Sequence, residues 1–429
     1  MTSISKLLGL LHQHEDRYKN SIHFAPRETY MSPFSRLPFV IDAYGRYFFS
    51  KKKAANASFH GGRELGGLEE EILIPVLQEM TGAGYINVRP ISGMNCLTVT
   101  LAALVEQGDT VLTLETDVGG HPSTPHIAKR LGINVEFMPM ETPYDLNLEH
   151  LADQIQRTQP ALIYIDQSNS LFPVKPAPIR ELVDRYSPRT LIHFDSSHLN
   201  GLILGGAVFN PLSCGADTFG GSTHKTVPGP HKAFLATNNS KLAAKFDSMG
   251  NYFVSHSHMA EVISLAITLL EMKYCGGSTY ASSVVENAQS FAHHLAEMGT
   301  TVAAPERNFT ECHQVWVTPD TDNPRELVER LYRCGLIVND FQTLPGISRH
   351  SFRLSLAEMT KLGMRKADVH SLAQTFQDAL SPALPERKVR KQVSQIRQNF
   401  SQPHYCYTLE DIDSLPMEFV GLIEAMSPM

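Results

Sequence analysis

A lysine flanked by histidine and threonine lies in a stretch rich in small hydroxyl residues, glycine and proline. The stretch reads Asp217-Thr-Phe-Gly-Gly-Ser-Thr-His-Lys-Thr-Val-Pro-Gly-Pro-His-Lys-Ala-Phe-Leu235, with apolar residues at both ends. This pattern predicts that Lys225 lies at a strand end, where a turn exposes it to a pocket. A lysine amine in such a place can form a Schiff base with a carbonyl compound. Taken alone, the pattern fits an ordinary surface lysine better.

Two glycine-containing turns could hold an anionic, aromatic ligand. Ser92-Gly93-Met94-Asn95 joins an expected strand to an expected helix, and free backbone N–H groups at the start of a helix favour a phosphate. An ordinary serine N-cap is the alternative. Gly119-Gly120-His121-Pro122 allows close backbone approach and presents an imidazole that could stack on an aromatic cofactor. A capping or surface histidine would explain that turn as well.

A carboxylate and an arginine complete the set of candidate groups. Asp195-Ser-Ser-His198 follows Leu191-Ile-His-Phe, which predicts a carboxylate at the end of a buried strand. Such a group needs a partner, and a pyridinium nitrogen would serve, although a helix N-cap is an alternative role. Arg353 stands among apolar residues of an expected strand. A substrate carboxylate could satisfy it through two parallel hydrogen bonds, and so could an acidic residue of the fold.

The elements that must position these groups alternate between strand and helix. This alternation predicts an α/β fold, with a largely parallel sheet covered by helices on both faces, and ligands bind such sheets beyond the carboxyl ends of the strands. The expected strands are 85–88, 111–115, 135–138, 161–166 and 191–195, and the expected helices are 68–80, 92–106, 123–131, 148–157, 179–186 and 259–274. A smaller α+β unit follows, with helices at 284–298, 325–334 and 366–379 and strands at 314–318, 336–340 and 351–356.

We therefore expect four parts. Residues 1–67 form an amphipathic helix (3–18) and a loop-rich, aromatic segment that contacts a second subunit and the active site. Residues 68–280 form the large cofactor-binding domain and 281–383 the small α+β domain. Residues 384–429 form a tail with a basic helix at 387–397.

Composition excludes several classes of partner. The formal charge is −7 with both signs mixed along the chain, so neither nucleic acid nor a membrane surface is an expected partner. The N-terminal apolar run is too short for a signal peptide and no run could cross a bilayer. The six cysteines lie far apart without a C-x-x-C pair, which argues against a metal site and a disulfide framework. We expect a cytoplasmic protein that holds no metal.

Together, these candidates compose a pyridoxal 5'-phosphate (PLP) site. They are a helix start that can bind a phosphate, an imidazole that can stack on the ring, a carboxylate at a strand end, a lysine that can form a Schiff base, and an arginine that can bind a carboxylate. The chain resembles the fold type I PLP enzymes of the aspartate aminotransferase superfamily, in the serine hydroxymethyltransferase branch. The motifs that carry the resemblance are Ser92-Gly93, Gly119-Gly120-His121, Asp195-Ser-Ser-His198 with Gly201-Leu202, Thr223-His-Lys-Thr-Val-Pro-Gly-Pro230, and Arg353 with Thr360.

Two segments depart from the hydroxymethyltransferase pattern. Its Lys-Tyr-Ala-Glu-Gly is Arg46-Tyr-Phe-Phe-Ser50 here, and its Tyr-Tyr-Gly-Gly is Phe59-His60-Gly61-Gly62. The lost glutamate and tyrosine serve folate-dependent transfer in that family. The chain is more similar to the L-threonine transaldolases of antibiotic biosynthesis, which keep the PLP site without the folate requirement. Segments similar to theirs are Asp166-Gln167-Ser168, Leu212-Ser-Cys-Gly-Ala-Asp217 and Thr310-Glu-Cys-His-Gln-Val315.

The resemblance implies a role for each candidate residue. The catalytic set is Lys225, His121, Asp195 and His198; the cofactor-binding set adds Ser92, Gly93, Met94, Ser222, His224 and a partner subunit's Tyr47; the substrate-binding set is Arg353, Ser168, His60 and Glu28. A homodimer with shared active sites would act on an amino acid and an aldehyde.

The implied reaction is retro-aldol and aldol chemistry on a β-hydroxy-α-amino acid through a glycine quinonoid, in specialised metabolism. Two alternatives stay open. One is PLP-dependent β-elimination or decarboxylation-coupled deamination of a modified amino acid. The other is a binding protein that keeps the PLP fold without turnover.

Overall fold

A seven-stranded sheet forms the centre of the molecule in the computed structural model, which describes residues 3–47, 65–339 and 342–427. Its strand order is β2-β8-β7-β6-β5-β3-β4. The five strands from β4 to β7 run parallel, whereas β8 is antiparallel to both of its neighbours. The strands are β2 (Tyr85–Asn87), β3 (Thr110–Thr113), β4 (Asn134–Phe137), β5 (Leu162–Asp166), β6 (Leu191–Asp195), β7 (Thr218–Ser222) and β8 (Ala233–Thr237).

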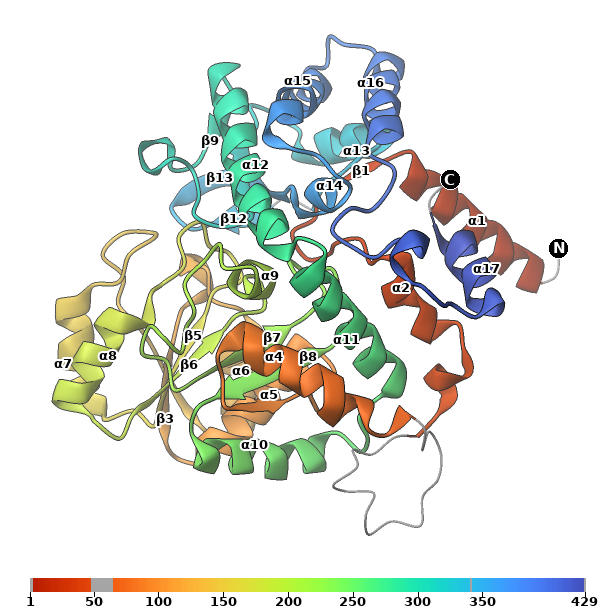
Figure 1. Cartoon of the computed structure of the whole chain (residues 1–429). Coiled ribbons are helices and arrows are strands. Elements are labelled where there is room, and N and C mark those ends of the chain that lie inside the picture. The colour runs from red at the N-terminus through yellow and green to blue at the C-terminus, as the bar shows by residue number, and fades with distance from the viewer. Residues whose placement is uncertain (1–2, 48–64, 340–341, 428–429) are drawn as a thin grey trace.

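Helices cover both faces of this sheet because successive strand residues point to opposite sides. In β5, Leu162 and Tyr164 pack with α5, α6 and α10, whereas Ile163 and Ile165 pack with the helices of the other face. The first group is α5 (Gly93–Leu104), α6 (Ser123–Arg130) and α10 (Ser240–Phe253). The second is α4 (Ile74–Thr81), α7 (Leu148–Thr158), α8 (Pro176–Tyr186), α9 (Asn200–Leu204), α11 (Met259–Tyr274) and the start of α12 (Gly277–Glu297). The expected α/β architecture is confirmed (Figure 1).

A four-stranded antiparallel sheet forms a second layer, with strand order β12-β13-β10-β9. Its strands are β9 (Thr301–Val302), β10 (Gln314–Thr318), β12 (Gln342–Leu344) and β13 (Ile347–Ser355). Apolar residues of β10 and β13 pack against α12, α13 (Pro324–Cys334), α15 (Val369–Leu380) and α16 (Glu386–Asn399). Figure 1 shows α12 running from the large sheet to this smaller unit, without a break near residue 280.

The N-terminal segment joins the smaller unit although it lies at the other end of the sequence. Strand β1 (Ile22–His23) pairs in parallel with β11 (Leu336–Ile337), and Phe24 lies in the core of the smaller unit. This pairing brings the residues that follow Phe24 between the two sheets. Three further helices are α2 (Pro33–Arg36), α14 (Ala357–Lys361) and the C-terminal α17 (Met417–Met426).

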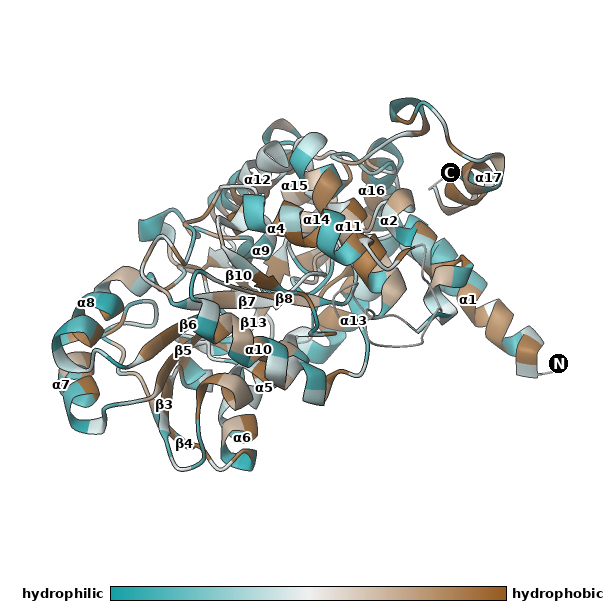
Figure 2. Ribbon diagram, turned by 60° about the horizontal axis from the view of Figure 1, so that its bottom comes forward, coloured by the Kyte–Doolittle hydropathy of each residue, from teal (hydrophilic) through white to brown (hydrophobic). Residues whose placement is uncertain are grey.

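Helix α1 (Ser3–Lys19) contains no buried residue. Five of its apolar side chains are between 52% and 60% exposed: Ile4, Leu7, Leu8, Leu10 and Leu11. In Figure 2 the helix extends away from the body of the molecule and carries brown, apolar turns. Among residues 3–47, 65–339 and 342–427, none covers this apolar face.

Most elements expected from the sequence are present at nearly the expected positions. The basic tail helix expected at 387–397 is α16, and the N-terminal helix expected at 3–18 is α1. Helix α10 was not expected; Asn239 caps it, accepting a 2.9 Å hydrogen bond from the backbone N–H of Lys241. Among the residues described, no helix has the length and apolar character needed to cross a bilayer.

Candidate active site

Lys225 follows β7, in the turn that leads to β8. All five residues of β7 are buried, so the strand fixes the start of the turn. Thr29 donates a hydrogen bond to the backbone carbonyl of Lys225, and the backbone N–H of Gly201 donates to Thr226 Oγ1 at 3.0 Å. Burial lowers the pKa of the Lys225 amine to about 8, a value that leaves part of it neutral near physiological pH.

Two carboxylates lie side by side at the ends of β5 and β6, where Asp166 pairs with Asp195 in the parallel register. Tyr164 donates a 3.0 Å hydrogen bond from its hydroxyl to Asp195, and the backbone N–H of Ser197 donates one of 2.9 Å. Burial and the neighbouring Asp195 raise the pKa of Asp166 to about 7, although Thr124 donates a hydrogen bond to it. Asp195 is therefore the better supported anion of the two.

His121 reaches the site from a turn that only glycine can form. Gly119 has φ +99°, and a Cβ atom there would lie 2.0 Å from the carbonyl oxygen of Asn169. His121 Nδ1 accepts a 3.2 Å hydrogen bond from the backbone N–H of Ser123. Burial lowers the pKa of His121, so the neutral ring carries its hydrogen on Nε2 and can donate it to a ligand.

His198 belongs to a buried chain of polar groups between the two sheets. His198 Nδ1 and His313 Nε2 are 3.2 Å apart, and His313 Nδ1 lies 3.0 Å from the hydroxyl of Ser355. Burial lowers the pKa of both imidazoles, that of His313 to about 3. Both rings are thus neutral, and they connect to the neighbouring groups through hydrogen bonds rather than ion pairs.

Arg353 extends from β13 toward the loop after β5 and is 4% exposed. Its Nη1 donates to the carbonyl oxygen of Ser168 at 2.6 Å and to the side-chain oxygen of Asn169. Its Nε has no partner, and within the described chain no carboxylate pairs with it. Burial lowers the pKa of Arg353 to about 9, as expected for a buried cation that has no anionic partner among the described residues.

The start of α5 lies against the ends of β6 and β7. Ser92 caps the helix by accepting a 3.1 Å hydrogen bond from the N–H of Asn95. A Cβ atom on Gly93 would come within 3.3 Å of both Ser197 and Ser222. Since the first N–H groups of a helix have no intrahelical acceptor, this corner offers donors to an anion at the edge of the sheet.

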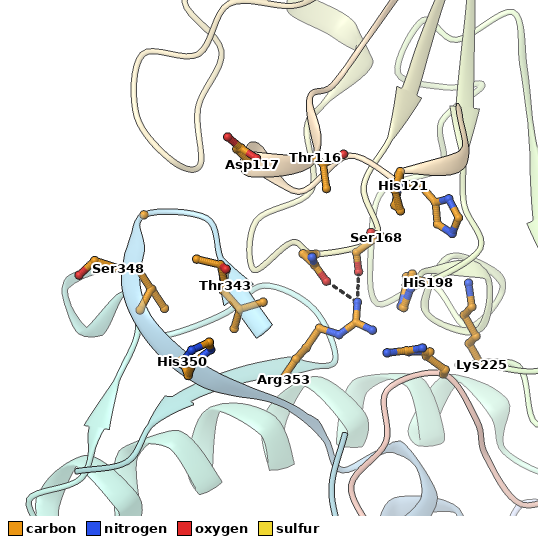
Figure 3. A pocket seen from close by; sticks show the side chains of 16 residues that line it. Thr116, Asp117, His121, Ser168, His198, Lys225, Thr343, Ser348, His350 and Arg353 are labelled. Atoms are coloured by element: carbon orange, nitrogen blue, oxygen red, sulfur yellow. Dashed lines mark hydrogen bonds between the residues drawn. The ribbon is translucent and has the colours of Figure 1, made fainter. Parts of the chain in front are cut away.

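One cavity of about 1030 Å³ connects several of these groups. Of the residues proposed from the sequence, Lys225, His121, His198, Ser168 and Arg353 line it. Figure 3 shows Lys225, His198 and Arg353 at one end of the cavity and residues of the β12–β13 hairpin at the other. Asp195 does not line this cavity; it lines a smaller one, and His198 lines both.

The other proposed residues do not line this cavity. His224 stacks on His231 with ring centroids 3.9 Å apart, and Tyr47 stacks on His256 at 4.2 Å. Met94 is 41% exposed. Glu28 lies 3.5 Å from His23 and faces a neighbouring cavity. His60 lies outside the described residues.

The sequence interpretation missed three parts of the cavity wall. Arg27 lines the cavity beside Lys225 and Arg353 and lowers the pKa of both. Thr116 and Asp117 come from a turn after β3, and Thr343, Ser348 and His350 come from the β12–β13 hairpin. For Arg27, its position immediately before the proposed Glu28 was a usable signal; for the others the sequence offered none.

The residues present fit PLP. The structure offers an amine of lowered pKa on Lys225, the carboxylate of Asp195 for a ring nitrogen, and the helix start at Gly93 for a phosphate. Arg353 lines the cavity and has no carboxylate partner among the described residues, which suits it to an anionic ligand. Asp166 accepts a hydrogen bond from Thr124, and its pKa of about 7 leaves it only partly ionised near neutral pH.

A mostly parallel seven-stranded sheet, with a buried lysine after β7 and a strand-end carboxylate, is the arrangement of a fold type I PLP-dependent enzyme. The chain belongs to the serine hydroxymethyltransferase family, whose model matches residues 3–376. This membership confirms the fold, the family and the class of enzyme expected from the sequence.

Three relatives refine the family assignment. An L-threonine:uridine-5'-aldehyde transaldolase from an Amycolatopsis species is 35% identical over 91% of this chain and 97% of its own length. A Sulfolobus acidocaldarius serine hydroxymethyltransferase is 28% identical over 96% of each chain. The crystal structure of L-threonine transaldolase from Pseudomonas fluorescens, in its internal aldimine state, has a TM-score of 0.88 and 25% identity, covering 99% of this chain and 97% of that chain.

These similarities place the chain among enzymes of aldol and retro-aldol chemistry on threonine-type amino acids. The transaldolase resemblance inferred from the motifs is therefore confirmed.

Proposed function

We propose that this protein binds PLP and transfers the glycyl unit of L-threonine to a second aldehyde, releasing acetaldehyde. The observation that carries the proposal is that Arg353 and Lys225 line the same cavity, and that Arg353 has no carboxylate partner among the described residues. An α-amino acid needs a carboxylate-binding cation and an amine-exchanging lysine at one site. Arg353 would hold the carboxylate with its guanidinium, which lines the cavity.

PLP, when bound, supplies the electron sink that stabilises negative charge at the α-carbon of an amino acid. Lys225 would hold its aldehyde, Asp195 its protonated ring nitrogen, and the helix start at Ser92, Gly93 and Met94 its phosphate. Ser222, packed against Gly93, would support that corner, as would Tyr47 from a partner subunit.

The remaining polar groups orient the substrate and move its protons. His121 donates from Nε2 into the cavity, so it would hold a substrate or cofactor oxygen rather than remove a proton. Retro-aldol cleavage requires a group that takes the β-hydroxyl proton. The amine of Lys225, with a pKa of about 8, is able to exchange a proton in this pH range. His198 would keep its position through His313, and Ser168 would fix Arg353.

We also propose that the enzyme is a homodimer with shared active sites. The apolar face of α1 requires a cover, and a second copy would supply it. We propose further that His60 and Glu28 contact the substrate. The cytoplasm remains the proposed location, since the cysteines carry no disulfide pattern.

The test is a reaction of the PLP-loaded enzyme with L-threonine and an aromatic or nucleoside aldehyde. We expect acetaldehyde and a new β-hydroxy-α-amino acid in equal amounts, measured by a coupled dehydrogenase assay and by mass spectrometry. Lys225→Ala should lose both products and the yellow colour of the loaded enzyme. Pyruvate and ammonia would indicate β-elimination, carbon dioxide would indicate decarboxylation, and the absence of any product would contradict the proposal.

A further inference from the structure

Four polar side chains lie together on one face of β5 and β6. Tyr164 pairs with His193, and Asp166 with Asp195, in the parallel register, so all four point to the same side of the sheet. The rings of Tyr164 and His193 stack with centroids 4.8 Å apart, and the Tyr164 hydroxyl donates to Asp195 at 3.0 Å. Two carboxyl groups therefore lie next to each other inside the protein.

Asp166 is buried and lines neither of the two cavities described above, whereas Asp195 lines the smaller one. Thr124 of α6 donates a hydrogen bond to Asp166, and the backbone N–H of His121 favours its ionised form. Asp166 thus lies between the turn that carries His121 and the carboxylate that we propose for the ring nitrogen. Any effect of Asp166 on the cofactor must pass through these neighbours rather than through direct contact.

The charges around the two carboxyl groups do not balance when both are ionised. Lys225 is the cation that acts on Asp166 and lowers its pKa, but the Lys225 amine, with a pKa of about 8, is itself partly neutral. Burial keeps the other ionisable neighbours neutral, because it lowers the pKa of imidazoles and raises the pKa of thiols and phenols: His121, His193, Cys96 and Tyr164.

One of the two aspartates therefore keeps a proton when no ligand is bound. Burial and the charge of Asp195 raise the pKa of Asp166 to about 7, which identifies Asp166 as the protonated partner. Pairing of Asp195 with a protonated ring nitrogen adds one positive charge beside the two carboxyl groups. Asp166 can then release its proton to the solvent, and its negative charge favours the protonated ring nitrogen in return.

We infer that Asp166 is a positioning residue for the cofactor: it releases its proton when a ring nitrogen binds Asp195, and its charge then keeps that nitrogen protonated. The protonated ring is the better electron sink for chemistry at the α-carbon. This inference rests on the proposed PLP site, but on neither the donor nor the acceptor. An Asp166 with a purely structural role would keep one protonation state in the free and the bound enzyme.

The test is isothermal titration calorimetry of the cofactor-free enzyme with pyridoxine 5'-phosphate, which has no aldehyde and so forms no Schiff base with Lys225. Titrations at one pH in buffers of different ionisation enthalpy count the protons released. At about pH 6 we expect the wild type to release nearly one proton more than Asp166→Asn, because a group with a pKa of about 7 is about nine-tenths protonated there. The affinity of the wild type relative to the variant should rise about tenfold between about pH 6 and 8.

Two controls and one further measurement make the result specific. An analogue of pyridoxine phosphate in which carbon replaces the ring nitrogen should release no such proton. Asp42→Asn, which changes an exposed carboxylate paired with Arg46, should behave as the wild type. Infrared difference spectra need no variant: binding of pyridoxine phosphate to the wild type should remove the C=O band of a protonated carboxyl group.

Equal proton release by the wild type and Asp166→Asn, equal release with the two ligands, or an unchanged carboxyl band would overturn the inference. No binding of pyridoxine phosphate at all would contradict the proposed PLP site and the inference together. Binding with Asp166-dependent proton release, but without acetaldehyde from threonine, would support the role of Asp166 and count against the transaldolase proposal alone.

Discussion

Arg353 Nη1 donates a 2.6 Å hydrogen bond to the backbone carbonyl of Ser168. This bond joins a strand of the smaller sheet to the loop that follows β5 of the large sheet. It also fixes the orientation of the guanidinium of Arg353, which lines the cavity. The guanidinium that we propose to bind the donor carboxylate is thus oriented before substrate arrives.

Replacing Arg353 by lysine should weaken donor binding, because an ammonium cannot reproduce both the bond to Ser168 and a two-point grip on a carboxylate. We expect the KM for L-threonine to rise about 30-fold or more, since loss of one partner of a buried charge pair costs about 2 kcal/mol or more. Arg349→Lys, on the exposed part of the same strand and paired with Asp320, is the control and should leave KM unchanged. An unchanged KM in Arg353→Lys would remove Arg353 from the donor site.

Removing the charge of Arg27 should raise the pKa of Lys225, because Arg27 is one of the cations that lower it. Attachment of PLP to the cofactor-free enzyme requires the neutral amine, so its rate should increase with pH around a midpoint of about 8. In Arg27→Gln this midpoint should move to higher pH. Stopped-flow absorbance after mixing with PLP measures the shift, and Arg46→Gln, exposed and paired with Asp42, should show none. A midpoint that moves to lower pH would contradict the assignment.

The pKa of Asp166, raised to about 7, predicts how stability depends on pH. In the unfolded chain an aspartate has a pKa of about 3.9. The folded state therefore binds more protons between these values, and the stabilisation is complete below about pH 4 and is lost as pH rises through 7. The difference in unfolding free energy between wild type and Asp166→Asn should accordingly decrease from pH 4.5 to 8.

Urea unfolding of the cofactor-free proteins measures this difference at each pH. His193, whose pKa burial lowers to about 4, acts in the opposite sense, and the comparison with the variant cancels its effect. Asp42→Asn is the control: Arg46 lowers the pKa of Asp42, so that carboxylate titrates below the range and the difference should be flat. A flat difference for Asp166→Asn would mean that Asp166 is charged in the folded state.

Gly119→Ala should destabilise the fold by at least about 2 kcal/mol, since a non-glycine residue in a sparsely populated backbone region costs about 1–3 kcal/mol before any clash. The new Cβ would lie 2.0 Å from the Asn169 carbonyl, so the turn must also move. Because Ser168 and Asn169 bond to Gly119, donor KM should rise as well. Gly9→Ala is the control, because no atom lies within 4 Å of its Cβ position; unfolding in urea should show no loss. Equal stability of the two variants would contradict the geometry.

Local sequence patterns were sufficient to predict which polar residues follow the strands of the large sheet. Lys225, Asp195 and His121 each follow a short apolar run, and their relative placement follows from the parallel sheet. The sheet itself could be predicted because buried strands and amphipathic helices alternate. Family resemblance then supplied the cofactor, which the individual motifs alone left open.

The parts that could not be predicted depend on contacts between distant segments. Arg27 reaches the cavity because β1 pairs with β11, and no local pattern indicates that pairing. The hairpin strand β13 was expected to begin at 351, but it begins at Ile347. Its first residues are exposed, so they lack the alternation that marks a half-buried strand. Asp117 looks like any aspartate in a turn, and only the folded chain places it at the cavity wall.

The turn at Thr116–Val118 and the β12–β13 hairpin are short, surface-connected segments that contribute nothing to the large sheet. The lysine, the strand-end carboxylate and the helix start belong to the sheet and its helices. A descendant of this enzyme could therefore change part of the cavity wall by replacing a few residues of two surface segments, while the sheet and its helices are inherited without change. In evolutionary terms, the geometry uncouples variation in the cavity wall from conservation of the central sheet.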